Sequence, residues 1–365
     1  MLFEIGRDTL LEGLSKTTPL TERKSTLPIL SHLLLTARES ELIMTATDLE
    51  TGLQVTCDCT VSDPGSVAVP ARKAFEIVRE LPSGTVKVEL LDTGRLGIEA
   101  GQSAIKLAVM DPTDYPAWSA FENVEKVPVP AQRLVYMIDK TIFAASTDES
   151  RFNLNGILVE QQDDKTTRLV ATDGHRLATI DENIGFSLTS KVLIPRKSLL
   201  EIRRILDSVE GEIQVGFEPK NVVITAERFT MTARLIEGDY PDYRKVVPPR
   251  SEVVIKAQRS ALIQTLKRVA VLTPDRNKGI GLDVSPGGME MTATHPDLGT
   301  ARDSIDVDYQ GDKFSVLINV DYLLDSLDAI DTDEIIFEYR KEGSPIVIRP
   351  FPEKDYFNLV MPMRK

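Results

Sequence analysis

The stretch Val170-Ala171-Thr172-Asp173-Gly174-His175-Arg176-Leu177-Ala178 occurs in related form once in each third of the 365-residue chain. An earlier version, Thr45-Ala46-Thr47-Asp48-Leu49-Glu50, closes a strand-like run 125 residues before it. A later version, Thr292-Ala293-Thr294-His295-Pro296-Asp297, closes a similar run in the last third. Self-similarity at a fixed offset indicates internal duplication. The sequence therefore predicts three tandem copies of one structural unit.

Two further markers keep the same offset and order. Val69-Pro70-Ala71-Arg72-Lys73 is matched by Ile194-Pro195-Arg196-Lys197, with the prolines 125 residues apart. Thr113-Asp114-Tyr115-Pro116 is matched by Gly238-Asp239-Tyr240-Pro241 and, more faintly, by Lys354-Asp355-Tyr356-Phe357. Three markers in one order make coincidence improbable, and they predict domains at residues 1–125, 126–250 and 251–365.

Helical and strand-like patterns follow the same order within each copy. Apolar periodicity predicts helices at residues 7–16, 71–81, 131–145, 196–208, 258–271 and 320–330. Short strand-like runs lie between them, separated by turn residues such as Asp92-Thr93-Gly94, a spacing typical of antiparallel hairpins. The predicted fold class is α+β: three repeats, each with two helices on an antiparallel sheet.

The composition limits the class of protein. Hydrophobic residues make up 42% of the chain, and no segment approaches the roughly 18 apolar residues of a membrane-spanning helix. Cys57 and Cys59 lie too close on one predicted strand for an ordinary disulfide, and no second pair completes a zinc pattern. We expect a soluble protein of the reducing cytoplasm, without membrane association.

The distribution of charge bears on a nucleic-acid partner. A net charge of −13 argues against phosphate binding if it is spread evenly. The six predicted helices together carry +4, however, which leaves −17 on the rest of the chain. Basic helices on an acidic protein are expected if one face meets phosphates. The alternative is that Lys and Arg simply favour solvated helices, and the acidic helix at 320–330 supports it.

Any contact with nucleic acid would involve its backbone. Aromatic residues are 6% of the chain, and the sequence has no helix-turn-helix, zinc-finger or RNP-type pattern. These features exclude the common ways of reading or stacking bases.

The sequence gives little indication of a catalytic or metal-binding site. Asp173-Gly174-His175 resembles part of a metal or catalytic site, but the other histidines, His32 and His295, lie in different repeats. A Thr-Asp pair at a strand end more often forms a turn through its own side-chain hydrogen bonds. No nucleotide-binding P-loop or Gly-x-Ser-x-Gly motif is present. We predict no cofactor, metal or catalytic residue; the competing hypothesis is a metal-dependent hydrolase of acidic polymers that uses Asp48, Asp173 and Asp297.

The repeat and several motifs together resemble one family over the whole chain. The motifs are residues 171–178, Asp239-Tyr240-Pro241-Asp242-Tyr243-Arg244, Pro70-Ala71-Arg72-Lys73 and the ending Val360-Met361-Pro362-Met363-Arg364. In combination they resemble the bacterial sliding clamps, the beta subunits of DNA polymerase III. The resemblance implies a non-catalytic, head-to-tail homodimeric ring of six similar domains that encircles duplex DNA without sequence specificity and makes the replicative polymerase processive.

The resemblance also implies two sets of residues in the ring. Side chains that face the DNA are expected to be Lys24, Arg72, Lys73, Arg79, Arg196 and Lys197. The subunit interface is expected to place Ile105 and Leu107 of one copy against Val271 and Leu272 of the other, a heterologous contact.

A groove for short linear motifs of polymerases, the clamp loader and repair proteins is the third implied feature. By motif it comprises Leu154, Thr172, Gly174, His175, Arg176, Leu177, Pro241, Val246, Val360, Met361, Pro362, Met363 and Arg364. The residue types suit this task, because Met361 and Met363 are flexible and polarizable and can repack around different peptides. The alternative for the Met-Pro-Met tail is a final strand packed into a core.

Overall fold

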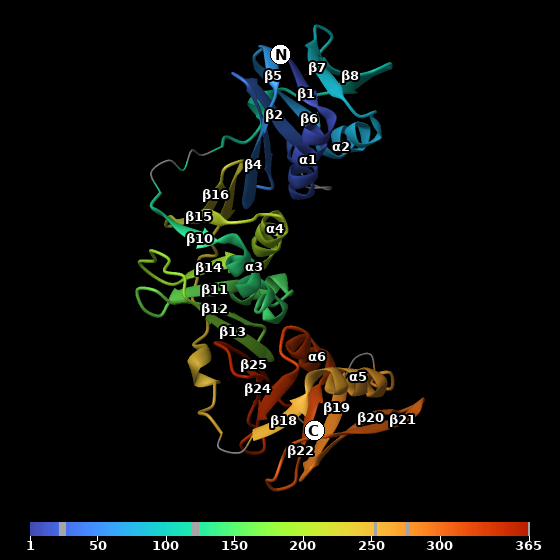
Figure 1. Ribbon diagram of the computed structural model, residues 1–365, viewed down its shortest axis with the longest axis vertical. Coiled ribbons are helices and arrows are strands. Elements are labelled where there is room, and N and C mark those ends of the chain that lie inside the picture. Colours follow the sequence, from blue (N-terminus) through green and yellow to red (C-terminus); the bar gives the residue numbers. More distant parts are fainter. Residues whose placement is uncertain (22–26, 119–120, 122–123, 252–253, 275–277, 364–365) are drawn as a thin grey trace. The chain divides into compact units, whose positions relative to one another are not determined.

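The computed structural model describes residues 1–21, 27–118, 121, 124–251, 254–274 and 278–363. Six α-helices lie in this described part: α1 (Arg7–Thr17), α2 (Ala71–Glu80), α3 (Ala131–Asp139), α4 (Arg196–Leu206), α5 (Arg259–Ala270) and α6 (Val320–Asp328). All six predicted helices are present (Figure 1). The expected end of α3 at residue 145 was wrong. Thr141 leaves the helical region at φ −128°, and a short 3₁₀ turn, Ile142–Ala144, follows it.

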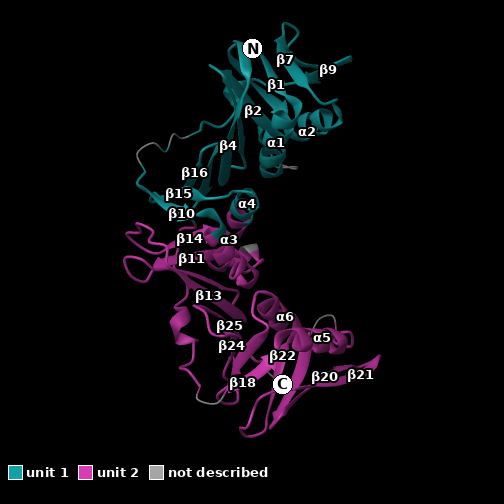
Figure 2. Ribbon diagram, in the orientation of Figure 1, with its two compact units in different colours: residues 1–132, 200–235 teal, residues 133–199, 236–365 magenta. Residues whose placement is uncertain are grey.

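The chain divides into two compact units, residues 1–132 with 200–235 and residues 133–199 with 236–365 (Figure 2). We call them unit 1 and unit 2 and describe each by itself.

Unit 1 holds two antiparallel sheets. The smaller has the strand order β5 (Thr60–Asp63), β1 (Leu2–Gly6), β7 (Thr85–Leu91), β8 (Arg95–Ala100) and β9 (Ser103–Ala108). The larger has the order β10 (Lys126–Pro130), β15 (Glu212–Phe217), β16 (Asn221–Ala226), β17 (Phe229–Arg234), β4 (Thr51–Asp58), β3 (Glu41–Thr47), β2 (His32–Arg38) and β6 (Gly65–Pro70).

Unit 2 repeats this plan. Its larger sheet has the order β14 (Val192–Pro195), β11 (Gly156–Gln161), β12 (Thr167–Thr172), β13 (Arg176–Glu182), β25 (Tyr356–Val360), β24 (Ile346–Phe351), β23 (Glu334–Glu338) and β18 (Val254–Gln258). Its smaller sheet has the order β21 (Gly299–Asp306), β20 (Gly288–His295), β19 (Gly279–Ser285) and β22 (Phe314–Asn319).

Each larger sheet joins strands of two successive repeats. At the first junction β17 pairs antiparallel with β4, with Met231 opposite Leu53. At the second junction β13 pairs antiparallel with β25, with Leu177 opposite Leu359. The second repeat thus contributes strands to both units. In each unit the sheet continues from one repeat into the next without a break in its hydrogen bonding.

The helices pack on the sheets through apolar stripes. Leu10 and Leu14 of α1 are buried, as are Leu262, Leu266 and Val269 of α5, whereas Ile263 of α5 is only half-buried. Full burial of such a side chain contributes about 2 kcal/mol. Helix α1 contacts α2, and α5 contacts α6, so the helices lie in pairs (Figure 1). Their polar faces are left on the surface.

Both cysteines are free thiols, and burial raises the pKa of each to about 11. No helix in the described part of the chain is both long and apolar enough to cross a bilayer.

Candidate functional site

The repeated Thr-Asp stretch forms the turn between β12 and β13. The Thr172 hydroxyl accepts a hydrogen bond from the Gly174 amide at 3.1 Å and donates one to the Arg176 carbonyl. The Asp173 carboxylate accepts from the His175 and Arg176 amides at 2.9 and 3.0 Å. Gly174 has φ +89°, a conformation that side chains other than glycine rarely adopt. The predicted turn through local hydrogen bonds is confirmed.

This geometry gives Asp173 a structural role. Its second carboxylate oxygen accepts from the Arg176 Nε at 3.0 Å, so both oxygens are bonded within the turn. No three His, Cys, Asp or Glu side chains in the described ranges lie close enough together to hold a metal ion. Both oxygens of Asp173 are thus engaged in holding the turn together.

Two aromatic rings hold the end of the turn. The Arg176 guanidinium lies 4.6 Å from the ring centre of Tyr322 and 5.5 Å from that of Phe143, and it forms an ion pair with Asp325 of α6. The His175 ring stacks on Tyr322 with centroids 6.0 Å apart. Stacking and charge both fix side chains that would otherwise sample many rotamers.

An apolar cluster lies beside this turn. Its buried members come from β11, β12, β13, β14, β24 and β25 and from residues 240–243: Leu158, Val170, Leu177, Leu193, Tyr240, Tyr243, Val347 and Leu359. Leu154, Ile236, Val247, Phe357 and Met361 pack against it and remain partly exposed. The Tyr240 hydroxyl donates to the Val170 carbonyl at 3.4 Å, which ties the Asp-Tyr-Pro marker to the sheet. A partly exposed apolar surface on a buried base is suited to receive apolar side chains.

The chain end borders the same cluster. Strand β25 ends at Val360, which is fully buried, but Met361, Pro362 and Met363 are only half-buried. The Met361 amide donates to the His175 carbonyl and the Met363 amide to the Leu317 carbonyl, each at 2.8 Å. The alternative of a packed final strand is wrong for residues 361–363. These three residues instead line a hollow of about 500 Å³, which we call the tail hollow.

The segment after Tyr240 forms a second border. Pro241 is exposed, and Val246 retains 43% of its accessible surface. Tyr243 and Arg244 anchor the segment by donating hydrogen bonds to Glu160, the latter at 2.7 Å. Burial raises the pKa of the Tyr243 hydroxyl, so it stays protonated and donates.

The predicted groove residues fall into two groups. Leu154, Gly174, His175, Arg176, Pro241, Val246, Met361, Pro362 and Met363 have accessible surface, whereas Thr172, Leu177 and Val360 are buried beneath them. Arg364 lies outside the described residues. Sequence reasoning missed Phe143, Tyr243 and Tyr322, which brace the groove from distant positions. Phe152 is exposed and lies close to Gly238.

Five of the predicted DNA-facing residues lie on α2 and α4: Arg72 and Lys73 in the first turn of α2, Arg79 in its last turn, and Arg196 and Lys197 in the first turn of α4. Arg72 and Lys73 are exposed, and both pair with Glu76, at 2.9 and 2.7 Å. Arg79 pairs with Glu80 at 3.1 Å. Lys197 is exposed and Arg196 half-buried. Lys24 lies outside the described residues. Exposed pairs of this kind contribute little to stability, so these cations remain available to a polyanion.

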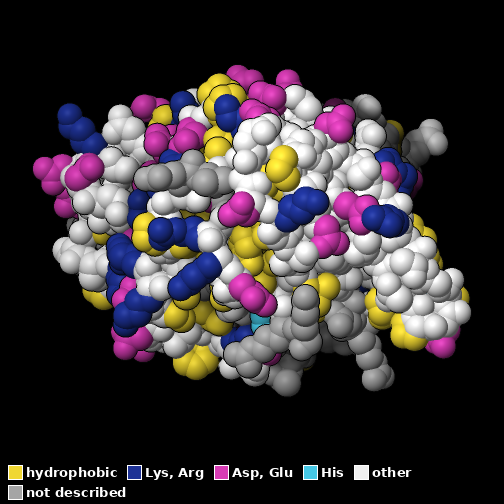
Figure 3. Space-filling model, turned by 90° about the horizontal axis from the view of Figure 1, so that it is seen from below, with side chains coloured by type: hydrophobic (Ala, Val, Ile, Leu, Met, Phe, Trp, Pro, Cys, Tyr) yellow, Lys and Arg dark blue, Asp and Glu magenta, His cyan; other side chains and the backbone are white. Residues whose placement is uncertain are grey.

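On the face drawn in Figure 3, several Lys and Arg side chains on the left lie beside hydrophobic ones, and Asp and Glu side chains lie both among them and along the upper rim.

The predicted interface residues lie on an edge strand and just after a helix. Ile105 and Leu107 are half-buried on β9, the last strand of the smaller sheet of unit 1. Val271, at the end of α5 in unit 2, keeps 77% of its surface, and Leu272 is half-buried. An exposed valine and an unpaired strand edge are each a common feature of association surfaces.

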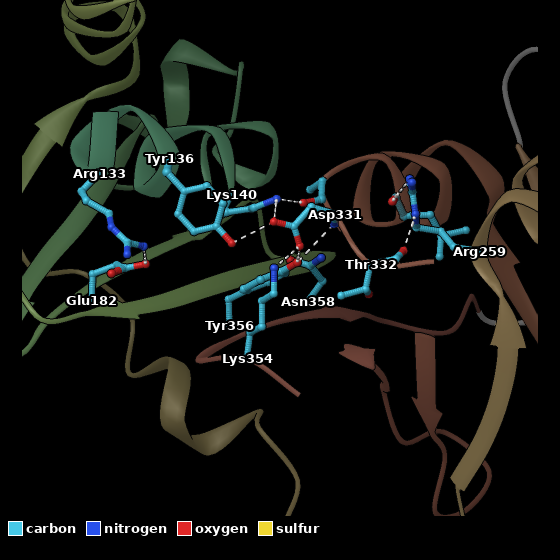
Figure 4. A network of polar contacts seen from close by, with 12 residues as sticks. Arg133, Tyr136, Lys140, Glu182, Arg259, Asp331, Thr332, Lys354, Tyr356 and Asn358 are labelled. Carbon is cyan, nitrogen blue, oxygen red and sulfur yellow. Dashed lines mark hydrogen bonds and ion pairs between the residues drawn. The ribbon is translucent and has the colours of Figure 1, made fainter. Parts of the chain in front are cut away.

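A polar network links α3 to the third repeat within unit 2 (Figure 4). Lys140 is buried between the rings of Tyr136 and Tyr356, 4.8 and 5.1 Å from their centres, and donates to the Ala329 carbonyl. Asp331 accepts from Tyr136 at 3.1 Å, from Tyr356 at 2.7 Å and from Lys354 at 2.9 Å. Burial opposes ionisation of Asp331, but the bonds from Lys354 and Tyr356 outweigh it and hold its pKa well below the usual range.

Comparison with known proteins covers the whole chain. Models of the DNA polymerase III beta subunit match its N-terminal domain to residues 1–119, its central domain to 128–242 and its C-terminal domain to 244–364. The beta sliding clamps of Pseudomonas aeruginosa and Proteus mirabilis are 33% and 34% identical over the full length of both chains. The crystal structure of the P. aeruginosa sliding clamp bound to griselimycin has a TM-score of 0.94, 32% identity and full coverage of both chains.

Proposed function

The chain belongs to the DNA polymerase III beta subunit family, the bacterial beta sliding clamps, and on this premise we propose that two copies close head to tail into a ring around duplex DNA. It is a non-catalytic processivity subunit that works in DNA replication. We assign it to the cytoplasm, and its three clamp domains to residues 1–125, 126–250 and 251–365.

The strand order carries the proposal for the ring. The sheets contain two kinds of four-stranded half-sheet, and each kind occurs once in every repeat. The first kind has the strand orders β1-β7-β8-β9, β10-β15-β16-β17 and β18-β23-β24-β25. The second kind has the orders β6-β2-β3-β4, β14-β11-β12-β13 and β22-β19-β20-β21. Within the chain, the last strand of the first kind pairs with the last strand of the second kind, as β17–β4 and β25–β13. Only β9 and β21 of these six last strands end their sheets.

By the same rule β9 of one copy pairs with β21 of a second copy. This pairing is heterologous, and two of them close a ring of two chains. It also covers two strand edges that would otherwise invite uncontrolled association. Ile105 and Leu107 of β9 would then meet the exposed Val271 and Leu272 near α5.

DNA is held by its topology and by diffuse attraction. The exposed cations of α2 and α4 face the phosphates, and the absence of base-reading motifs in the sequence leaves binding insensitive to base order. Affinity of this kind falls steeply with salt, whereas topological linkage does not. The linkage thus survives conditions that abolish simple adsorption.

The experiment separates these two modes of binding. The protein, loaded with its clamp loader and ATP on a nicked circular plasmid, should co-elute with the plasmid at about 0.5 M NaCl and leave it after one restriction cut. Retention on the cut plasmid would show ordinary adsorption and contradict the ring.

The groove around residues 172–177 and 361–363 recruits partners through short linear motifs. Its chemistry supports this role, because Leu154, Val246 and Met361 offer apolar surface and the turn residues hold the border rigid. Partners of this kind include the replicative polymerase, the clamp loader and repair proteins. Griselimycin should bind this chain, and Met361→Arg should weaken that binding at least tenfold; unchanged binding would contradict the assignment.

A further inference from the structure

A basic, aromatic hollow lies next to the tail hollow in the third repeat. It has a volume of about 810 Å³, and its lining includes Tyr309, Phe314, Tyr339, Lys313, Arg340 and Lys341. The Phe314 and Tyr339 rings stack with centroids 4.5 Å apart, and Phe314 meets Tyr309 edge-on at 6.0 Å. We call it the Tyr339 hollow. Packed rings make its floor rigid, so a ligand finds a shape that already exists.

The two hollows are neighbours. Ser315, Tyr339 and Glu342 line both of them. The tail hollow is lined in turn by Met361, which also packs against the apolar cluster of the groove. The groove, the tail hollow and the Tyr339 hollow therefore share lining residues from one to the next, all within unit 2.

The charge of the Tyr339 hollow is opposite in sign to that of the protein. Four cationic side chains line it, those of Arg250, Lys313, Arg340 and Lys341, against the carboxylates of Asp312 and Glu342. Arg250 is engaged with Glu338 and Glu353. Within the described ranges no ion pair involves Lys313, Arg340 or Lys341, and all three are exposed. Three such cations on a protein of net charge −13 favour an anionic ligand.

We propose that the Tyr339 hollow receives an acidic segment that flanks the groove-binding motif of a partner protein. The proposal rests on the proposed groove and extends it: the motif supplies apolar contacts, and the acidic flank supplies charge. Attachment to one chain raises the effective concentration of the flank at the hollow, so even weak ion pairs add to the affinity. Partners with the same motif would then be ranked by the charge of the residues beside it.

The test uses peptides with defined flanks. Overlapping fluorescent peptides of the cognate replicative polymerase first identify the shortest one that binds the wild-type protein. That peptide is then extended at either end by four Glu, four Ser or four Lys residues. At one end the Glu extension should bind about tenfold more tightly than the Ser extension at 50 mM NaCl, and this difference should shrink at 300 mM NaCl. The Lys extension should bind more weakly than the Ser extension.

Variants locate the effect. Lys313→Glu combined with Lys341→Glu should remove the gain of the Glu extension while leaving the affinity for the Ser extension within about twofold. Lys165→Glu, an exposed lysine on the loop between β11 and β12, is the matched control and should leave the gain intact.

Four results would overturn the proposal. Equal affinities for the three extensions at both ends, or a gain that survives the double charge reversal, would exclude the hollow as an acidic-peptide site while leaving the groove in place. Failure of every unextended peptide to bind would remove the groove as well. Binding of a fluorescent dT12 oligonucleotide that the double reversal abolishes, with no gain from Glu, would assign the hollow to nucleic acid instead.

Discussion

The two junctions between repeats are built on the same hydrogen bonds but differ in what lies against them. At the first junction the Thr47 hydroxyl accepts from the Leu49 amide at 3.0 Å, and Asp48 accepts from the Thr51 amide at 2.7 Å. Residues 172–176 make the corresponding bonds at the second junction, at 3.1 and 3.0 Å. The Thr-Asp turn is therefore a structural part of every such junction and does not by itself make a binding site.

The backbone hydrogen bonds between the two repeats at each junction correspond as well. The Arg234 amide donates to the Glu50 carbonyl, and the Met361 amide donates to the His175 carbonyl, both at 2.8 Å. After Arg234 the chain continues into a buried Leu235, whereas after Met361 it runs through the half-buried residues 362 and 363.

A tryptophan marks the other difference. At the first junction a Cβ on Gly52 would lie only 2.7 Å from the Trp118 ring, so the indole rests directly on the strand. At the second junction Leu177 stands at the position of Gly52 and Tyr243 at that of Trp118, each 125 residues later. We infer that a groove exists where the chain does not cover its own junction.

The largest expected effect comes from removing the tail at the second junction. Deletion of residues 361–365 should weaken binding of a partner peptide by at least about a hundredfold, because the groove loses one border and the amide bonds to His175 and Leu317. Fluorescence anisotropy measures the affinity, and circular dichroism checks the fold. Trp118→Ala is the matched change at the first junction and should leave that affinity unaltered. Full binding, or full polymerase stimulation, by the truncated protein would refute the groove assignment.

Lys140 at the second junction should matter more than Arg204 at the first. Lys140→Ala removes a buried cation that donates to the Ala329 carbonyl and pairs with Asp331, and it should cost about 2 kcal/mol of local stability. Arg204 also donates to a helix-end carbonyl, that of Lys16 at 2.7 Å, but a third of its side chain is exposed. Its replacement by Ala should cost about 1 kcal/mol. Hydrogen exchange of β25 and β4 amides measures both, and equal effects would contradict the ranking.

The same network predicts a response to acid. The pKa of Asp331 is lower in the folded protein than its ordinary value, so its contribution is fully present above about pH 4. It is lost as the pH falls through the folded pKa. Urea unfolding followed by exchange at β25 should show a steeper loss of stability below about pH 4 for the wild type than for Asp331→Asn. If the stability of the two proteins fell equally with decreasing pH, the Asp331 carboxylate would not be stabilised in its ionised form by this network.

The smallest expected effects distinguish the two turns. Gly174→Ala should cost about 1 kcal/mol, because φ is +89° there and open space allows the methyl group but not the backbone strain. Leu49 already has φ +75° at the matching position and is half-exposed, so Leu49→Gly should change stability by less than about 0.5 kcal/mol. Thermal unfolding compares the two variants; a larger cost at Leu49 would reverse the interpretation.

The sequence predicted local structure better than it predicted assembly of the groove. The six helices could be predicted from their apolar periodicity. The Thr-Asp turn could be predicted because its side chains form hydrogen bonds with backbone groups only a few residues away. The motifs predicted that Thr172, Leu177 and Val360 belong to the groove, and the structure has these three side chains buried beneath it. Their burial depends on packing by residues far away in the sequence, which the motifs do not reveal. Tyr322 and Lys140 act through contacts across repeats, and Phe143 contacts Arg176 from a distant position in the same repeat. Such contacts leave no periodic signal.

Ring closure through β9 and β21 is the central claim, and solution mass tests it most directly. Sedimentation equilibrium of the purified chain near micromolar concentration should give a species close to twice 40.5 kDa. Combined Val271→Ala and Leu272→Ala should shift it toward the monomer mass. A wild-type protein that sediments as a monomer, or a double variant with an unchanged dimer, would contradict the account.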